Sequence, residues 1–468
     1  MAQTILNVAR KSHIIKKKQG GVNVLVRFAV ENFMSYKERQ IFSMVAGKQT
    51  KHKNHVIEIQ GKRLLRGSFL WGANAAGKSN LFSAIQFAKN IVQVGVQRGD
   101  LTNKHFRIEE GYVDKPGVFQ FDIATNGHLY SYGFAISYRS ATIVEEWLYL
   151  CDSSEKIIFE RSIENGRMVI NKDVEFKDSA NEQVFTIFAE NVPDEKLLLS
   201  EISERKLIEM DDFFPYRDVR GWFENLMILT PKTRRISSDD LLEEEQKVFR
   251  DFDTGIVNIN LKREKMEDVL DFLPHTIKED LMSDIEQSFA SDEKKGKKSN
   301  VSRIVRIGGK SFKFQKKDNQ IYVAQRVMDH GNPKDLFQLS DESDGTQRLF
   351  DLVPLYREGK QNHVIFVDEL DRSFHTKLVQ KYIEQFYSMT EGAESQLIAS
   401  VHDSNVMDLN LLRQDEIWFV ERQKDHSTQI YSLNRFQERY DKKVSKDYLL
   451  GRYGAIPCFS QIDDEAKE

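Results

Sequence analysis

The chain has 468 residues, of which 40% are hydrophobic and 30% charged, so it can bury substantial cores and, at roughly 150 residues each, form about three domains. Its 68 basic and 72 acidic side chains give a formal net charge of −4, which neither favours nor excludes a nucleic-acid partner. The only cysteines, Cys151 and Cys458, exclude a disulfide framework and a four-cysteine zinc site, and the absence of a membrane-spanning or signal-peptide pattern predicts a cytoplasmic protein.

The N-terminal part of the chain begins with a polar, basic stretch. Residues 1–21 end in two glycines, which predicts a loosely ordered basic arm. Within residues 22–180, short runs rich in β-branched and aromatic residues occur between positions 106 and 170. Turn signals of the Asn-Gly type separate several of these runs, at residues 126–127 and 165–166. The pattern predicts an antiparallel β lobe.

A phosphate-binding pattern lies within the same part of the chain. Residues 72–79, Gly-Ala-Asn-Ala-Ala-Gly-Lys-Ser, fit the P-loop pattern G-x-x-x-x-G-K-[ST]. A buried strand is expected over residues 64–71 and a helix over residues 80–88, which is the context that the pattern requires. The glycines let backbone N–H groups converge on phosphate, Lys78 supplies a cation, and the Ser79 hydroxyl is a hard ligand for Mg²⁺. The residues predicted to bind the nucleotide are Gly72, Asn74, Ala75, Ala76, Gly77, Lys78, Ser79 and Asn80.

The middle of the chain has a different pattern of apolar residues. Residues 181–300 carry apolar residues at helical spacing without a long heptad pattern, which predicts an inserted subdomain of short helices. A charged loop at residues 293–299 is interpreted as a solvated turn rather than a nucleic-acid contact. Residues 301–307 and 311–314 are strand-like, and residues 301–468 are expected to return to the P-loop domain.

Two acids follow a strongly apolar run in this last part. Residues 364–367 are all apolar and precede Asp368 and Glu369, which predicts a buried strand that delivers carboxylates to its C-terminal end. Open α/β sheets bind their ligands at that end. Asp368 fits an acid that anchors Mg²⁺, and Glu369 fits a base that polarises the attacking water.

Three further signals accompany these acids. A Ser-Asp-Gly turn with Ser343 and Gly345 starts a helical run, a polar loop carries Asp371, and a second apolar strand ends in His402. With the P-loop, this order resembles the ABC-type ATPases, a class that includes transporter motor domains and the SMC, Rad50 and RecF heads. In that resemblance Ser343 and Gly345 match the signature motif, Asp368 and Glu369 the Walker B pair, Asp371 the D-loop and His402 the switch histidine. The resemblance implies that Lys78, Glu369 and His402 are catalytic, that Ser79 and Asp368 hold Mg²⁺, and that Ser343, Gly345 and Asp371 contact ATP.

The chain resembles more closely the stand-alone SMC-like ATPases labelled AAA15 or AAA21. These share the loop sequence, a Ser-Asp-Gly-Thr signature where transporters have Ser-Gly-Gly, and a Glu-Leu-Asp-x-Ser-x-His segment, here residues 369–375. They also share Glu-Asn-Phe after a strand, here residues 31–33, and a Gly-Arg-Tyr-Gly-Ala tail, here residues 451–455. The resemblance covers residues 23–175 and 300–457. It implies an α/β fold, an ABC-type P-loop ATPase head with an N-terminal antiparallel β lobe and an inserted α-helical subdomain.

This resemblance also implies partners. In such ATPases the signature motif of one subunit completes the ATP site of another, so a homodimer or higher oligomer is expected. Members of the family serve bacterial anti-phage systems such as PARIS, where they work with a nuclease or toxin. We therefore expect a slow, regulatory ATPase that answers to a phage-encoded trigger protein. Only 66 residues follow His402 (468 − 402) and no acidic triad with Toprim spacing is found, so a Toprim or other nuclease effector is expected on a separate chain.

Two other functions stay open on the sequence. A DNA-repair ATPase of RecF type would bind DNA in a salt-dependent way. A non-enzymatic scaffold would hold ATP without turnover. A transporter motor is disfavoured because the strand-rich lobe and the helical insertion do not match that class, and no membrane partner is expected.

Overall fold

The computed structural model describes residues 22–164, 167–173, 175–204, 211–231, 243–271, 273–294, 302–307, 310–317, 320–332, 334–436, 438–439 and 442–457. The chain divides into two compact units, one formed by residues 1–233 with 356–468 and the other by residues 234–355. The expected basic arm at residues 1–21, the turn at residues 165–166 and the charged loop from residue 295 onward lie outside the described residues.

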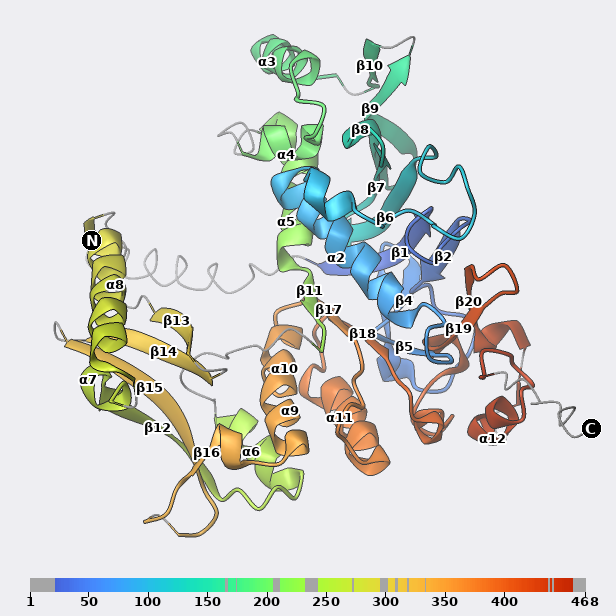
Figure 1. The fold of residues 1–468 in the computed structure, drawn as a ribbon. Helices are drawn as coiled ribbons and strands as arrows, with labels where there is room; N and C mark the ends of the chain where they lie inside the picture. The colour runs from blue at the N-terminus through green and yellow to red at the C-terminus, as the bar shows by residue number, and fades with distance from the viewer. Residues whose placement is uncertain are drawn as a thin grey trace, which may run out of the picture. The chain divides into compact units, whose positions relative to one another are not determined.

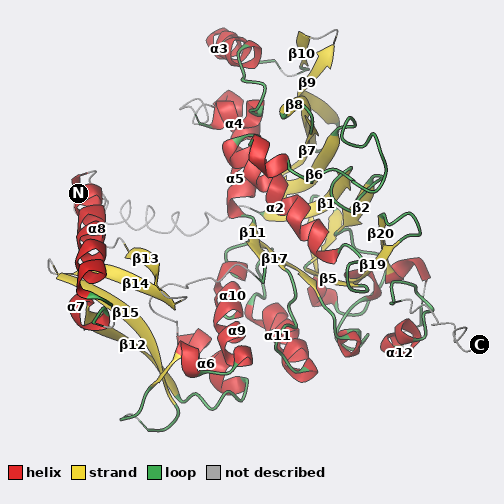
Figure 2. Ribbon diagram, in the orientation of Figure 1, coloured by secondary structure: helices red, strands yellow, loops and turns green. Residues whose placement is uncertain are grey.

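A six-stranded sheet forms the centre of the first unit (Figure 1, Figure 2). Its strands, in spatial order, are β11 (Met227–Leu229), β17 (Val364–Val367), β18 (Gln396–Ser400), β5 (Gly67–Trp71), β19 (Ile417–Arg422) and β20 (Thr428–Ser432). All neighbours are parallel except β19 and β20. Every residue of β5 and of β17 is buried, as in a parallel sheet covered on both faces. Figure 1 shows α2 (Lys78–Val94) and α11 (Thr376–Met389) on opposite sides of it.

A seven-stranded antiparallel sheet forms the expected β lobe. Its strands, in spatial order, are β10 (Arg167–Asn171), β9 (Glu155–Glu164), β8 (Thr142–Cys151), β7 (His128–Ser137), β6 (Gly117–Thr125), β1 (Asn23–Glu31) and β2 (Gln40–Ser43). Asn126 and Gly127 have φ values of 50° and 85° and make the expected tight turn between β6 and β7.

Helix α2 connects the two sheets through its aromatic residues. The ring of Phe82 lies 5.8 Å from that of Phe366 in β17, and the ring of Phe87 lies 5.5 Å from that of Phe119 in β6. One continuous apolar core therefore supports both sheets. The predicted fold class, an α/β P-loop head with an antiparallel β lobe, is confirmed.

Gln396 forms a second link between the sheets. Its side chain accepts from the N–H of Leu25 at 2.6 Å and donates to the Leu25 carbonyl oxygen at 3.0 Å and to the Leu65 carbonyl oxygen at 2.9 Å. Strand β1 has a register shift between Leu25 and Arg27, so the amide of Gln396 satisfies backbone groups next to an irregular part of the ladder.

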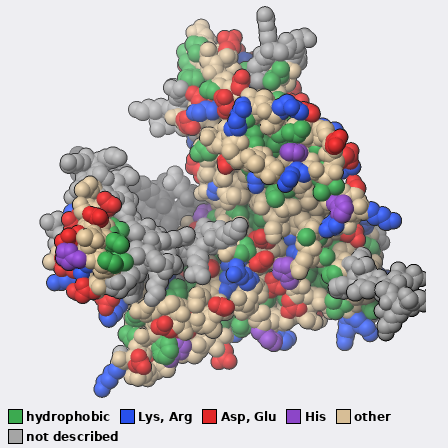
Figure 3. All heavy atoms as spheres, in the orientation of Figure 1, with side chains coloured by type: hydrophobic (Ala, Val, Ile, Leu, Met, Phe, Trp, Pro, Cys, Tyr) green, Lys and Arg blue, Asp and Glu red, His purple; other side chains and the backbone are tan. Residues whose placement is uncertain are grey.

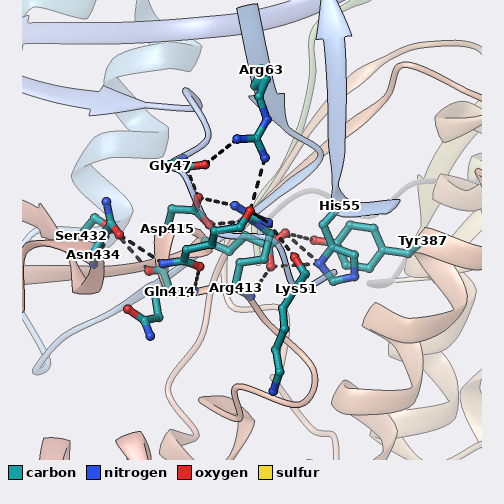
Figure 4. A network of polar contacts seen from close by, with 12 residues as sticks. Gly47, Lys51, His55, Arg63, Tyr387, Arg413, Gln414, Asp415, Ser432 and Asn434 are labelled. Atoms are coloured by element: carbon teal, nitrogen blue, oxygen red, sulfur yellow. Dashed lines mark hydrogen bonds and ion pairs between the residues drawn. The ribbon is translucent and has the colours of Figure 1, made fainter. Parts of the chain in front are cut away.

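A buried polar network fastens the segment after β2 to the segment before β19 (Figure 4). Arg413 forms a two-point contact with Asp415 at 2.9 and 2.8 Å. Glu416 is fully buried, lies 3.0 Å from His55 Nδ1 and accepts from the Tyr387 hydroxyl at 2.7 Å. Since each buried acid has a positively charged or hydroxyl partner, the network tolerates its burial.

The remaining elements of this unit are β3 (Val56–Ile59), β4 (Lys62–Leu65), α3 (Ser179–Glu190), α4 (Leu198–Ser203), α5 (Phe214–Asn225) and α12 (Val444–Leu449).

The second unit contains an antiparallel sheet of which the sequence indicated only two strands, the strand-like runs at residues 301–307 and 311–314. Its strands, in spatial order, are β12 (Asn258–Lys265), β15 (Gln320–Asp329), β14 (Lys310–Lys317) and β13 (Ser302–Ile307), and β16 (Phe337–Gln338) also pairs with β15. Its helices are α6 (Glu243–Asp251), α7 (Met266–Val269), α8 (His275–Lys294) and α9 (Asp344–Leu352), and α10 (Pro354–Gly359) begins at its end.

The expected helical insertion at residues 181–300 is therefore corrected in two respects. Strand β12 lies inside that range and pairs with β15, which lies beyond it, so both sides of residue 301 belong to one folded unit. Helices α3, α4 and α5 lie in the first unit instead. Within the part of the chain that the structure describes, no helix is both long enough and apolar enough to cross a membrane.

Candidate nucleotide site

The P-loop follows the central strand β5 and leads into α2. Both glycines of the loop are required because other atoms lie too close for a side chain. A Cβ atom on Gly72 would lie 2.2 Å from the carbonyl oxygen of Val420, and one on Gly77 would lie 2.3 Å from the Thr428 hydroxyl. Gly77 also has a φ of 111°, a conformation that side chains disfavour.

The loop exposes some residues and buries others. Asn74, Ala75 and Ser79 are exposed, whereas Gly77 and Lys78 are buried. Gly77, the N-cap of α2, has no side chain to cap the helix, and the N–H of Asn80 donates to the Gly77 carbonyl oxygen at 3.1 Å. The N–H groups of Lys78 and Ser79 therefore stand at the positive end of the helix dipole. A helix N-terminus of this kind attracts phosphate.

Residues far away in the sequence hold the loop in shape. The Tyr36 hydroxyl donates to the carbonyl oxygen of Gly77 at 3.0 Å, and the Thr428 hydroxyl lies 2.8 Å from that of Ala76. Ser35 accepts from the side chain of Asn80 at 2.7 Å, and its hydroxyl lies at the same distance from that of Thr428. Burial raises the pKa of Tyr36 far above its usual value, so its hydroxyl stays protonated and remains a donor.

Sequence reasoning missed this support. Ser35 and Tyr36 lie just after the Glu-Asn-Phe segment of residues 31–33, a motif that could have pointed to them. Thr428 belongs to no motif that could have pointed to it. The asparagine of that segment is structural. Asn32 donates to the carbonyl oxygens of Tyr112 and Lys115 at 2.8 and 2.9 Å. These bonds tie the turn after β1 to the segment before β6.

Lys78 brings the two halves of the candidate site together. Its ammonium group donates to the carbonyl oxygens of Gly72 at 2.6 Å and Ala73 at 3.1 Å. Burial lowers the pKa of Lys78, while the charges of Asp368, Asp371 and Glu369 act in the opposite direction. The acids predicted from the C-terminal third therefore lie within electrostatic reach of the P-loop lysine.

The two acids after β17 differ in exposure. Asp368 is 5% exposed, and its Oδ1 accepts from the Ser400 hydroxyl at 2.6 Å. The side chain of Glu369 is 34% exposed, and its Oε1 lies 3.9 Å from Nε2 of His402, whose side chain is 43% exposed. At this distance the two side chains are close but not hydrogen-bonded to each other.

Asp371 contacts backbone rather than open space. Its Oδ2 accepts from the N–H groups of His402 and Asp403 at 2.8 and 2.7 Å, so it shapes the turn after β18. Its other oxygen is buried without a hydrogen-bond partner among the described residues.

Ser343 and Gly345 belong to the other compact unit. Ser343 is the N-cap of α9, where its hydroxyl accepts from the N–H of Thr346 at 3.2 Å, and Gly345 lies in the first turn. The P-loop with the acids, and the predicted signature turn, therefore belong to separate units of the chain.

The donors fit a nucleotide with Mg²⁺. Ser79 offers a hydroxyl and Asp368 a carboxylate, which are hard oxygen ligands of the kind that Mg²⁺ prefers. Among the described residues no group of three or more His, Cys, Asp or Glu side chains is arranged to hold a metal by itself. A magnesium ion here would need phosphate oxygens as further ligands, which is the usual arrangement in nucleotide sites.

Comparisons with known proteins agree with the loop and the acids. Residues 68–408 match the family AAA_21, described as "AAA domain, putative AbiEii toxin, Type IV TA system". No curated protein sequence matches the chain.

Solved structures show distant likeness. A crystal structure of an SMC head bound to the C-terminal winged-helix domain of ScpA has 15% identity and a TM-score of 0.38, over 88% of this chain and 99% of that one. The SMC head domain of Thermotoga maritima has 11% identity and a TM-score of 0.33, over 87% and 98%. A structure of the recombination mediator RecF has 13% identity and a TM-score of 0.33, over 88% and 100%.

The family match is the comparison that decides the assignment. It spans both the P-loop and the acids after β17, and it confirms the resemblance to AAA21 that the motifs indicated. Since it covers well over half of the 468 residues, the chain belongs to the AAA_21 family.

Proposed function

We propose that the protein is an ATPase that binds and slowly hydrolyses ATP with Mg²⁺. The observation that carries this proposal is the parallel arrangement of β17, β18 and β5, in which Asp368 and Glu369 follow β17 and the P-loop with the buried Lys78 follows β5. A fixed cation and a carboxylate that can hold a metal, next to a more exposed acid, are the parts that phosphoryl transfer to water needs.

Each residue has a distinct task in this reaction. Lys78 and the N–H groups at the start of α2 bind the β- and γ-phosphates. Ser79 and Asp368 would hold Mg²⁺, which neutralises phosphate charge when it is bound. Glu369 orients the attacking water and takes its proton, and His402 lies at 3.9 Å from Glu369, where it can steady the γ-phosphate.

We further propose that two copies of the chain share each ATP site. The turn at Ser343 offers a hydroxyl and a helix N-terminus, both suited to phosphate. Hydrogen bonds to charged groups contribute about 1.5–3 kcal/mol each, so several of them across an interface would make ATP hold a dimer or higher oligomer together. Hydrolysis would then release it.

The family description supports a regulatory role in cell defence. AAA_21 is described with a toxin and a type IV toxin–antitoxin system. The protein would couple ATP-dependent assembly to the control of a separate toxin or nuclease, such as a Toprim nuclease, in answer to a phage-encoded trigger, in the cytoplasm. On the face shown in Figure 3, basic and acidic side chains are interspersed among the described residues, so this view offers no basic patch that would favour DNA.

The test is phosphate release by the purified chain with Mg²⁺ and ATP, compared with Glu369→Gln. The variant should bind ATP with unchanged affinity and lose about 10²–10⁴ in rate, because a positioned base contributes that much. Turnover of Glu369→Gln at the parental rate would refute the role of Glu369. Salt-dependent stimulation of the parent by DNA would replace the effector role with a DNA-repair role, and ATP that is bound but never turned over would indicate a scaffold.

A further inference from the structure

Ser400 joins the two acids of the candidate site. It is the last residue of β18, and the parallel ladder between β17 and β18 ends one residue earlier, at Val367 and Ala399. Beyond that point, hydrogen bonds made by the hydroxyl and the carbonyl oxygen of Ser400 join the two segments. Its hydroxyl donates to Asp368 Oδ1 at 2.6 Å and accepts from the N–H of Glu369 at 2.7 Å. Its carbonyl oxygen accepts from the N–H of Leu370 at 3.0 Å.

The direction of these hydrogen bonds follows from proton count. A backbone N–H can only donate, so the Ser400 oxygen must accept from Glu369. The single hydroxyl proton is then directed to Asp368. Ser400 is fully buried and Asp368 nearly so, which leaves little room for water to take over either bond. The hydroxyl thus fixes one oxygen of the carboxylate that would hold Mg²⁺.

The same hydroxyl fixes the backbone of the proposed base. Glu369 has a φ of 53°, in the left-handed region that residues other than glycine rarely adopt. Such a conformation persists only where surrounding contacts impose it, and the bonds from Ser400 to the N–H groups of Glu369 and Leu370 do so. This backbone conformation separates the buried Asp368 from the half-buried Glu369 over a single peptide bond.

We infer that Ser400 is a positioning residue that sets the geometry of the metal-holding acid and of the base together. The inference rests on the proposed ATPase function. In this role Ser400 touches neither ATP nor water. It keeps Asp368 oriented toward the metal and keeps the side chain of Glu369 outside the sheet, so that binding at the first acid and proton transfer at the second occur in one fixed arrangement.

The experiment compares Ser400→Ala and Ser400→Cys with Ser395→Ala. Ser395 is also fully buried, and its hydroxyl has no hydrogen-bond partner among the described residues, so its removal controls for loss of a buried hydroxyl. Ser400→Cys keeps the volume but donates weakly, and it serves where Ser400→Ala fails to fold. The measurements are kcat and KM for ATP, the Mg²⁺ concentration that gives half of the maximal rate, and binding of a fluorescent ATP analogue as Mg²⁺ is varied.

If Ser400 is a positioning residue, its replacement should change kcat and the Mg²⁺ requirement much more than KM for ATP. The Ser400 variants should lose at least about tenfold in kcat and need several-fold more Mg²⁺, with KM for ATP within about threefold of the parent. A purely structural role would lower the melting temperature and leave kcat of the folded protein unchanged, which would overturn the inference, as would a match with Ser395→Ala. If the parent itself does not hydrolyse ATP, the proposed function fails, and the Mg²⁺ dependence of binding still decides whether Ser400 orients Asp368.

Discussion

The ammonium group of Lys78 donates to the carbonyl oxygen of Gly72 at 2.6 Å, so the single lysine of the P-loop is bonded to its first glycine. With the contact to the Ala73 carbonyl oxygen at 3.1 Å, it holds the ammonium group against the first two residues of the loop. It also places that charge in a mostly buried position, where burial lowers the pKa of Lys78 and three nearby acids oppose that shift.

Replacing this lysine should remove nucleotide binding. In Lys78→Ala the phosphates lose their cation while Asp368 and Glu369 remain. The repulsion between the phosphates and these two carboxylates is then no longer offset by a positive charge. With about 1.5–3 kcal/mol for each charged hydrogen bond, we expect ATP affinity to fall at least about a hundredfold. Equilibrium titration with a fluorescent ATP analogue measures it. Asn90→Ala, an exposed position on the same helix, should bind like the parent, and ATP binding by Lys78→Ala at parental affinity would contradict the assignment.

The lowered pKa of Lys78 gives a prediction about pH. Because the pKa lies below its usual value, Lys78 loses its proton at a lower pH than an exposed lysine. Phosphates favour the charged form, so ATP binding should be strongest below this pKa and should weaken as pH rises through it. Calorimetric titrations in two buffers of different ionisation enthalpy should show proton uptake on binding, growing toward alkaline pH. Binding that is independent of pH up to the pKa of an ordinary lysine would refute this.

Gly77→Ala separates backbone strain from steric conflict. The new Cβ would meet the Thr428 hydroxyl at 2.3 Å in a residue with a φ of 111°. We expect loss of ATP binding and a lower melting temperature. Gly61→Ala is the matched control, since Gly61 has a φ of 73° with nothing within 4 Å of its Cβ position. It should cost about 1–2 kcal/mol of stability and leave ATP binding intact. Equal effects of both changes on ATP binding would show that the contact with Thr428 is unimportant.

The parts of the site that a sequence can reveal are those that are contiguous. Gly72, Lys78 and Ser79 stand in one pattern, and Asp368 and Glu369 follow one apolar run. Ser400 and Thr428 could not be found in this way, because each acts through hydrogen bonds to backbone or side chains that lie more than 30 residues away in the chain.

In the sheet of the second unit, β13 and β14 match strand-like runs of the sequence, but β12 was missed for a different reason. Strand β12 reads Asn-Ile-Asn-Leu-Lys-Arg-Glu-Lys, and its charged residues resemble a solvated segment. Its partner β15 lies about 60 residues later in the chain. The apolar residues Ile259 and Leu261 alternate with polar ones, but only the pairing with β15, in which Ile259 lies opposite Met328, shows that this alternation belongs to a half-buried strand. Local composition does not carry that information.

Gln396 gives a prediction about stability. Gln396→Ala leaves the N–H of Leu25 and the carbonyl oxygens of Leu25 and Leu65 without this partner, in a fully buried place. An unsatisfied buried polar group costs about 1–3 kcal/mol, so the free energy of unfolding should fall by about 2–5 kcal/mol. Gln396→Glu should also destabilise, since a carboxylate cannot donate. Urea denaturation measures both against Gln361→Ala, an exposed control, and a loss below about 0.5 kcal/mol would contradict the link between the sheets.

A shared ATP site predicts complementation between two inactive variants. Lys78→Ala removes the P-loop cation, and Ser343→Arg places a bulky side chain at the N-cap of α9, so neither homodimer contains an intact site. In a mixed dimer, the P-loop of the Ser343→Arg copy faces the unchanged signature turn of the Lys78→Ala copy. With free exchange at equal concentrations about half of the dimers are mixed, and each has one intact site of two, so phosphate release should recover to about a quarter of the parental rate. Mixing Lys78→Ala with Glu369→Gln controls for exchange alone, because the P-loop and Glu369 belong to the same copy of the site and no intact site can form. Recovery in that control, or none in the first mixture despite confirmed exchange of subunits, would show that each chain uses its own signature turn or none.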